Sequence, residues 1–332
     1  SCTACHARRG CVDIVDVFGH AGVNHVLGIH GVNAHMFDGE QIETQTSGAL
    51  QQSKEFQKTL CALNVPHRRL ENGALVLQRR FGPFQVNLIS RAGFARSDPL
   101  RILLGVAGLK EPLLLSPEAP LTLNTTGVVP LISPATIAVL DLGPSRDELR
   151  LGLHSKWRNR LRHGEKQGLC VVRQYMPDSM THWLLDAEDV QRRQRGYRGW
   201  PREMTLAFAR ENKGDAKLFI ALWGREPVAA ILILRHGRTA TYHIGHTRPS
   251  GRLMSAHTLL LWSAIRWAKT QGLAAFDLGA VNAEDAPGLT RFKLGTGATT
   301  RTLGGTWLIW RPLRPVAGPL ARLDRKLMRL EP

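Results

Sequence analysis

The sequence predicts an α+β protein in which helices flank a mixed, mostly antiparallel sheet. Three observations indicate this class. Strand-like runs and helix-like periods alternate along residues 48–310, three consecutive runs are joined by turns of three residues, and a long apolar helix follows them. Turns this short connect antiparallel neighbours, because a parallel pair needs a crossover of roughly a dozen residues. The centre of the sheet is therefore expected to be antiparallel.

The chain length favours two domains. A single core stops growing at about 250 to 300 residues, and this chain has 332, of which 43% are hydrophobic and 21% charged. We expect an unassigned segment at 1–46, a first domain at 47–144, a second at 145–310 and a basic amphipathic tail at 311–332. The apolar runs are all shorter than the ~18 residues that a membrane span requires.

The charge balance indicates an acidic partner. The chain has 44 Lys and Arg against 27 Asp and Glu, a formal net charge of +17. Such an excess attracts polyanions, including tRNA, phosphorylated precursors, an acidic carrier protein or an anionic membrane surface. The alternative is the general composition of an Arg-rich proteome, and charge alone does not choose among these.

Cysteine usage favours a reduced compartment. The chain has an odd number of cysteines, and both Cys61 and Cys170 lie within apolar patterns. We therefore predict a cytoplasmic protein without a disulfide framework, with peripheral contact at the inner membrane as an extension of that location. No metal site is predicted, because the histidines of the first segment, spaced by five, share neither a helix face nor a strand face. These are His20, His25, His30 and His35.

The first domain is predicted to contain two helices and several strands. Residues 49–64 have helical periodicity with Phe56, Leu60 and Leu63 on one side, and Pro66 ends the pattern. The remaining elements are strands at 74–80 and 84–90, a short helix at 99–108, and strands at 113–116 and 128–142.

The second domain begins with a helix signature. Ser145 and Glu148 form a capping box, and apolar residues then repeat every four positions until Gly168. The following elements are a strand at 169–174, helices at 180–195 and 201–211, strands at 217–223, 228–234 and 239–246, a buried helix at 256–270, a strand at 274–278, a short helix at 289–294 and a last strand at 302–310.

Several stretches of the second domain occur in an order and spacing that resemble one enzyme family. They are Lys-Trp-Arg-Asn-Arg-Leu-Arg at 156–162, Ala-Ala-Ile at 229–231, Thr-Tyr-His-Ile-Gly at 241–245, Phe-Asp-Leu-Gly at 276–279 and Gly-Leu-Thr-Arg-Phe-Lys at 288–293. They resemble the Fem-type aminoacyl and peptidoglycan-bridge transferases, which have the GNAT acyltransferase fold. The resemblance is good across 145–310 and fair across 48–142, and it implies two GNAT-like domains in tandem, the first degenerate.

The resemblance implies an enzyme that transfers an acyl or aminoacyl group to an amine by direct attack. Aminoacyl-tRNA is the implied donor. The alternative is an acyl-CoA or acyl-carrier-protein donor with a lipid, polysaccharide-linked or small amine as acceptor, and the second alternative is a non-catalytic protein that binds nucleic acid or membrane. We expect a donor and an amine acceptor as partners, no tightly bound cofactor and no stable protein partner.

The turn before the buried helix departs from the acetyl-CoA pattern. GNAT acetyltransferases hold the pyrophosphate with Arg/Gln-x-x-Gly-x-Gly/Ala, where backbone N–H groups contact the anion. Here the stretch reads Arg-Pro-Ser-Gly-Arg-Leu at 248–253, so Leu253 replaces a small residue and Pro249 lacks an N–H. Arg248, Gly251 and Arg252 remain candidates for donor binding, but CoA itself is in doubt.

The basic run at 156–162 is the second candidate for donor binding. A run of cations usually forms a solvated face, but here no acids balance them over several turns, which is also typical of contact with phosphates. They are Lys156, Arg158, Arg160 and Arg162.

Four residues are predicted to be catalytic. The resemblance places Lys293 near the aminoacyl ester, where an ammonium could offset the charge of an oxyanion; its neighbour Phe292 either contacts the donor or packs. Tyr242 and His246 are four apart on one strand and are expected on the same face, Tyr242 to orient substrate or protonate the leaving oxygen and His246 as a base. Asp277 ends a buried strand, so it is either functional or a cap for the loop at Gly279.

Overall fold

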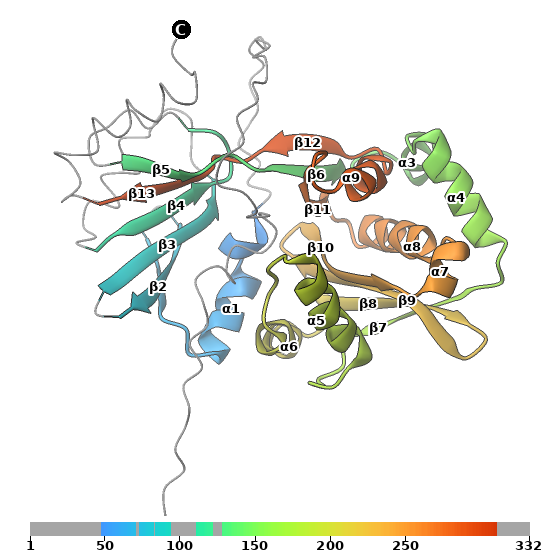
Figure 1. Ribbon diagram of the computed structural model, residues 1–332, viewed down its shortest axis with the longest axis horizontal. Coiled ribbons are helices and arrows are strands. Elements are labelled where there is room, and N and C mark those ends of the chain that lie inside the picture. Colours follow the sequence, from blue (N-terminus) through green and yellow to red (C-terminus); the bar gives the residue numbers. More distant parts are fainter. Residues whose placement is uncertain (1–47, 71–72, 83, 94–110, 122–127, 311–332) are drawn as a thin grey trace, which may run out of the picture.

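A computed structural model describes residues 48–70, 73–82, 84–93, 111–121 and 128–310. Two lobes lie side by side, each built on its own sheet (Figure 1). The predicted helix at 99–108, the segment 1–46 and the tail 311–332 lie outside the described residues. None of the described helices is long and apolar enough to cross a membrane.

The first lobe contains a six-stranded sheet in the order β1-β2-β3-β4-β13-β5, in which only β3 and β4 are parallel. The helix α1 begins at Ser53, whose side chain accepts a hydrogen bond from the Phe56 amide. The elements are η2 (Leu50–Gln52), α1 (Lys54–Ala62), β1 (His67–Arg69), β2 (Leu75–Phe81), β3 (Phe84–Ala92), β4 (Leu113–Pro117), β5 (Val128–Ile132) and β13 (Thr306–Ile309).

The second lobe contains a seven-stranded sheet in the order β12-β6-β11-β10-β9-β8-β7. As expected from the short turns, β8, β9 and β10 form an antiparallel meander. The elements are β6 (Thr136–Asp141), α3 (Arg146–Leu151), α4 (Ser155–Glu165), β7 (Cys170–Tyr175), α5 (Trp183–Arg195), α6 (Arg202–Glu211), β8 (Ala216–Trp223), β9 (Glu226–His236), β10 (Thr239–Thr247), α7 (Pro249–Leu253), α8 (Ala256–Thr270), β11 (Ala275–Val281), α9 (Pro287–Leu294) and β12 (Thr299–Thr302).

The lobes exchange strands. The single strand predicted at 128–142 is two strands, of which β5 stays in the first sheet and β6 pairs with β11 and β12 in the second. The strand predicted at 302–310 is also divided, and its second part, β13, lies between β4 and β5 of the first sheet. Local pattern predicts that a segment is extended, but it does not say which sheet the segment joins.

The helix predicted from Ser145 to Gly168 is interrupted. The capping box of Ser145 and Glu148 is present, but α3 ends at Leu151 and α4 begins at Ser155. At the break the amide of His154 donates to the carbonyl of Gly295, 2.9 Å away, instead of continuing the helix. A tertiary contact therefore divides a segment whose apolar spacing is continuous.

The two lobes share a hydrophobic core. Phe56 and Leu60 of α1 are fully buried in one cluster with Leu206 and Phe208 of α6, on one face of the second sheet. Asn212 secures this contact, because its amide nitrogen donates to the carbonyl of Glu55, 3.0 Å away. On the other face of that sheet α8 is buried along most of its length, as its apolar sequence predicts.

Candidate active site

The second sheet divides between its two central parallel strands. β10 and β11 are paired only from Thr239 with Ala275 to Thr241 with Asp277. Beyond this point β10 continues to Thr247 along β9, and β11 continues to Val281 along β6. The strands therefore separate at Asp277 and leave a V-shaped opening in the second sheet.

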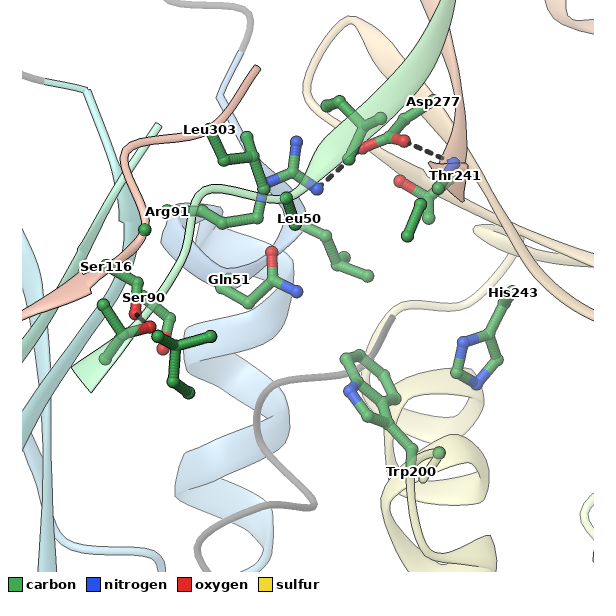
Figure 2. A pocket seen from close by; sticks show the side chains of 18 of the residues that line it. Leu50, Gln51, Ser90, Arg91, Ser116, Trp200, Thr241, His243, Asp277 and Leu303 are labelled. Carbon is green, nitrogen blue, oxygen red and sulfur yellow. Dashed lines mark hydrogen bonds and ion pairs between the residues drawn. The ribbon is translucent and has the colours of Figure 1, made fainter. Parts of the chain in front are cut away.

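A cavity of about 90 Å³ lies at the start of this opening, between the two lobes. β10 and β11 line it on one side, η2, β3 and β4 line it from the first lobe, and Trp200 closes it near the start of α6 (Figure 2). The cavity has room for roughly six water molecules or a small organic group.

Asp277 lines the cavity in a buried ion network that joins the lobes. Its Oδ2 accepts a 2.8 Å hydrogen bond from Nη1 of Arg91 on β3, and its Oδ1 accepts from the amide of Gly279 (Figure 2). Arg91 also donates to Glu118, which in turn pairs with Arg301 of β12. Burial lowers the pKa of Arg91, but the two carboxylates outweigh this and raise it. Asp277 therefore makes the expected cap contact with Gly279 and is paired with Arg91, while its catalytic role stays a prediction.

Lys293 is buried beside the opening. Only 7% of the residue is exposed, and its Nζ donates a 2.7 Å hydrogen bond to the carbonyl of Ala280, a residue that lines the cavity. Burial lowers the pKa of Lys293 to about 8, although Asp277 acts in the opposite direction. Phe292 faces away from this contact and packs between Trp157 and His257, with ring centroids 6.1 and 5.2 Å away.

Tyr242 and His246 lie on opposite faces of the sheet, contrary to the sequence prediction. The pairing of β10 with β9 shifts between Tyr242 and Ile244, which marks a β-bulge at His243. Tyr242 packs with the core under α8, whereas Ile244 packs with the core under α5 and α6. A bulge adds one residue to the strand, so side chains beyond it change faces.

Tyr242 is held by a histidine that the sequence analysis did not identify. Its hydroxyl lies 3.0 Å from Nε2 of His257, whose Nδ1 lies 2.7 Å from the hydroxyl of Thr247. Burial, with a smaller effect of His246, lowers the pKa of His257 to about 4, so the ring is neutral near pH 7. Gly245 makes this arrangement possible, because a Cβ there would lie 1.7 Å from the Tyr242 hydroxyl.

His246 lies apart from the cavity, in basic surroundings. Its ring is 6.3 Å from that of Trp183, edge to face, and the guanidinium carbon of Arg248 lies 5.7 Å from the same ring. Burial, followed by Arg252 and Arg248, lowers the pKa of His246. The lowered pKa favours the neutral form of the His246 ring, which lies among cationic side chains. His246 does not line the cavity that Asp277 lines.

The stretch at 248–253 contains the short helix α7 (Pro249–Leu253), and several amides in and directly after it donate to carbonyls of the protein. The amide of Arg248 donates to Val228, that of Arg252 to Arg248, that of Met254 to Ser250 and that of Ser255 to Arg252. Gly251 is buried against β9, where a Cβ would lie 2.4 Å from the carbonyl oxygen of Val228. The glycine is therefore explained by close packing.

The basic run forms the outer face of α4. Lys156, Arg160 and Arg162 are exposed and Arg158 is half-buried. The opposite side is anchored by Trp157, which is 4% exposed, and by Leu161. Lys156, Arg158, Arg160 and Arg162 thus lie on a helix that packs against α8 and, through Trp157, against α9.

Sequence reasoning missed the residues that the first lobe and α5 contribute to the cavity. Arg91 is 186 positions from its partner Asp277, and Gln51, Ser90 and Glu188 also line the cavity. Arg91 could have been identified from the sequence, because an arginine in a strand that is expected to be buried needs a charged or polar partner. Cys61 and Cys170, placed in apolar patterns by sequence, are both exposed.

Comparisons with known proteins agree with this arrangement. The family model described as acetyltransferase (GNAT) domain matches residues 153–298. The crystal structure of FemX superposes with a TM-score of 0.64 at 15% identity and covers 84% of this chain and 95% of that one. A conserved protein of unknown function from Bacteroides thetaiotaomicron gives 0.52 at 11% identity, covering 79% and 91%. No curated protein matches the sequence.

GNAT domains generally use acyl-CoA as a co-substrate without a tightly held cofactor, and they bind an amine acceptor. The expected α+β class and the expected Fem-like resemblance are confirmed by the fold and by these comparisons. Residues 153–298 of this chain match the model of the acetyltransferase (GNAT) domain, and they lie within a two-lobed fold that is similar to that of FemX.

Proposed function

We propose that the protein transfers an aminoacyl group from aminoacyl-tRNA to an amine acceptor in the opening between β10 and β11. The observation that carries this proposal is the separation of the two strands at Asp277 next to a cavity, with the buried Lys293 fixed at Ala280 on the edge of that cavity. Lys293 itself does not line the cavity, so the proposal requires the carbonyl group to enter beside Ala280.

The reaction needs few groups. The neutral amine attacks the ester carbonyl, the C–N bond forms as the C–O bond breaks, and the leaving oxygen takes a proton. Lys293 would stabilise the negative charge that develops on the carbonyl oxygen, and low exposure would strengthen that interaction. Tyr242, oriented by His257, would supply or relay the proton on the α8 side of the sheet.

Two features favour tRNA over CoA as the donor. Within 248–253 the amides of Arg248 and Arg252 donate to carbonyls of the protein and Pro249 has no N–H, so this turn offers fewer donors than the pyrophosphate loop of a GNAT acetyltransferase. The outer face of α4 carries three exposed cationic side chains, Lys156, Arg160 and Arg162. Cations of this kind neutralise the phosphates of a nucleic-acid backbone.

The donor is tested with the purified full chain. Radiolabelled aminoacyl-tRNA and a set of acyl-CoA thioesters are supplied separately with a mixture of primary amines, with and without RNase. We expect labelled amide from aminoacyl-tRNA only, and its loss after RNase. Thiol release that RNase does not affect would instead establish a thioester donor, and no transfer from either donor would favour the non-catalytic alternative.

Lys293→Met tests the site itself, with Lys213→Met as the matched control because Lys213 is exposed on the loop after α6. We expect transfer to fall by roughly 10²-fold or more in Lys293→Met and to be unchanged in Lys213→Met. Equal activity of both variants would remove Lys293 from the mechanism.

A further inference from the structure

The cavity contains two buried polar atoms that the fold does not satisfy. Oε1 of Gln51 and Oγ of Ser90 have no hydrogen-bond partner among the described residues, and the two residues are 6% and 2% exposed. Both residues line the cavity, and the Gln51 amide points into the space between Arg91 and Trp200 (Figure 2). Buried polar atoms in proteins almost always have a partner, so these two atoms indicate a bound polar group.

The charges that line the cavity do not cancel. Arg91, Glu188 and Asp277 are the charged lining residues within the described part of the chain. The guanidinium of Arg91 pairs with two carboxylates, those of Asp277 and Glu118. Glu188 of α5, in contrast, forms no salt bridge among the described residues, and its Oε1 accepts a 2.9 Å hydrogen bond from the hydroxyl of Tyr197. The cavity therefore favours a cation in a protein whose net charge is +17.

The rest of the wall is apolar. Leu50, Ile137, Trp200, Ile244 and Leu303 line the cavity between its polar groups. A ligand that matches this wall has an apolar body, because small-molecule sites combine apolar walls with a few polar groups that fix orientation. A phosphate or carboxylate group would meet the carboxylate of Glu188 in a cavity whose lining cation, Arg91, is already paired with two carboxylates.

We propose that this cavity binds the acceptor as a primary amine with an apolar body, with the nitrogen at Glu188 and a polar end at Gln51 and Ser90. The role as acceptor rests on the proposed function, whereas amine binding itself does not. Glu188 takes one proton from the bound ammonium, which leaves the neutral amine needed for attack. The second proton lost from nitrogen on amide formation goes to the leaving oxygen, and Glu188 returns its proton to water.

The surroundings of Glu188 suit this step. Burial raises the pKa of its carboxyl; the Tyr197 hydroxyl and the nearby Arg192 and Arg195 oppose this, while Asp189 adds to it. Arg91, Asp277 and His243 face the same cavity from the other strands. A carboxylate with a raised pKa is a better proton acceptor from an ammonium than an ordinary glutamate.

The test measures binding without any acyl donor. Isothermal titration of the full chain compares n-hexylamine with n-hexanol and hexanoate, which have the same apolar body. We expect the amine to bind at least 10-fold more tightly than either. Glu188→Gln should remove that preference, and Glu226→Gln, which changes an exposed acid at the start of β9, should retain it. Equal affinity for the three probes in the wild type would overturn the proposal.

Two further measurements cover the case in which Glu188→Gln does not fold. Wild-type affinity for hexylamine should fall on acidification at a higher pH than an ordinary glutamate titrates, and Ser90→Ala should weaken binding of 6-amino-1-hexanol, which has a polar end, more than binding of hexylamine. A pH-independent affinity, or an equal effect of Ser90→Ala on both probes, would count against the site. Amine binding without acyl transfer from any donor would leave the site standing and reject only the proposed function.

Discussion

Arg91 of the first lobe and Asp277 of the second form an ion pair of 2.8 Å at the point where β10 and β11 separate. Their side chains are 15% and 7% exposed. Glu118 joins the same guanidinium, so one residue of β3 links the opening in the second sheet to the first lobe.

Arg91→Met should destabilise the protein strongly. The substitution leaves Asp277 and Glu118 buried with less compensation, which costs about 3 to 5 kcal/mol in comparable buried pairs. Urea unfolding measures the change. Arg210→Met is the matched control, because its pair with Asp178 is 48% and 54% exposed and contributes about 0.5 kcal/mol or less. Similar losses in both variants would contradict the importance of the buried network.

Gly245→Ala should disrupt the Tyr242–His257 pair. A Cβ at this position would lie 1.7 Å from the tyrosine hydroxyl and 2.9 Å from Cε1 of His257, so the ring must move at a cost of about 1 to 3 kcal/mol. Thermal unfolding and the acyl-transfer rate should both decline. Gly288→Ala introduces the same methyl group in α9, where nothing lies within 4 Å, and should lower neither the stability nor the transfer rate.

The transfer rate should have an alkaline limb that belongs to Lys293. Burial lowers the pKa of this residue to about 8, and the protonated form, which stabilises an oxyanion, is present below that value. Activity should therefore decline as the pH rises through about 8. In Lys293→Arg the arginine keeps its charge in this pH range. This variant should therefore show no decline of the transfer rate at alkaline pH, even if its maximal rate is lower. An unchanged limb in Lys293→Arg would assign it to another group.

Ser90→Ala should stabilise the ligand-free protein. The Ser90 hydroxyl is buried without a partner among the described residues, and its removal should gain about 1 kcal/mol. Ser116→Ala is the informative comparison, because that hydroxyl lies 2.9 Å from the hydroxyl of Thr306 and its loss should cost about 1 kcal/mol. Chemical denaturation of both variants measures the difference, and a loss of stability in Ser90→Ala would show that the hydroxyl already has a partner.

Charge reversal on α4 should weaken donor binding if the donor is a tRNA. Arg160→Glu and Arg162→Glu should raise KM for aminoacyl-tRNA and reduce the salt dependence of binding by about one counterion per lost phosphate contact. Arg225→Glu, exposed in the β8–β9 turn, should have a smaller effect. Equal salt slopes for all three variants would place the tRNA elsewhere.

Much of the second lobe could be predicted because its signals are local. The short turns predicted the meander of β8, β9 and β10, and the apolar run predicted α8 with the bounds that the structure has. The relation of Tyr242 to His246 could not be predicted, because the bulge at His243 depends on pairing with β9. The cavity was also beyond sequence reasoning, because Arg91 meets Asp277 only after both sheets have formed.

The exchange of β6 and β13 has a consequence for any attempt to separate the two halves of the chain. A fragment that begins at residue 145 would lack β6, the strand that joins β11 to β12, and would carry β13 with both of its neighbours missing. A fragment that ends at residue 144 would lack β13, which lies between β4 and β5 in the first sheet. Edges exposed in this way promote aggregation. In the intact chain, the two halves should therefore unfold in a single thermal transition. Each half should be insoluble when it is produced alone.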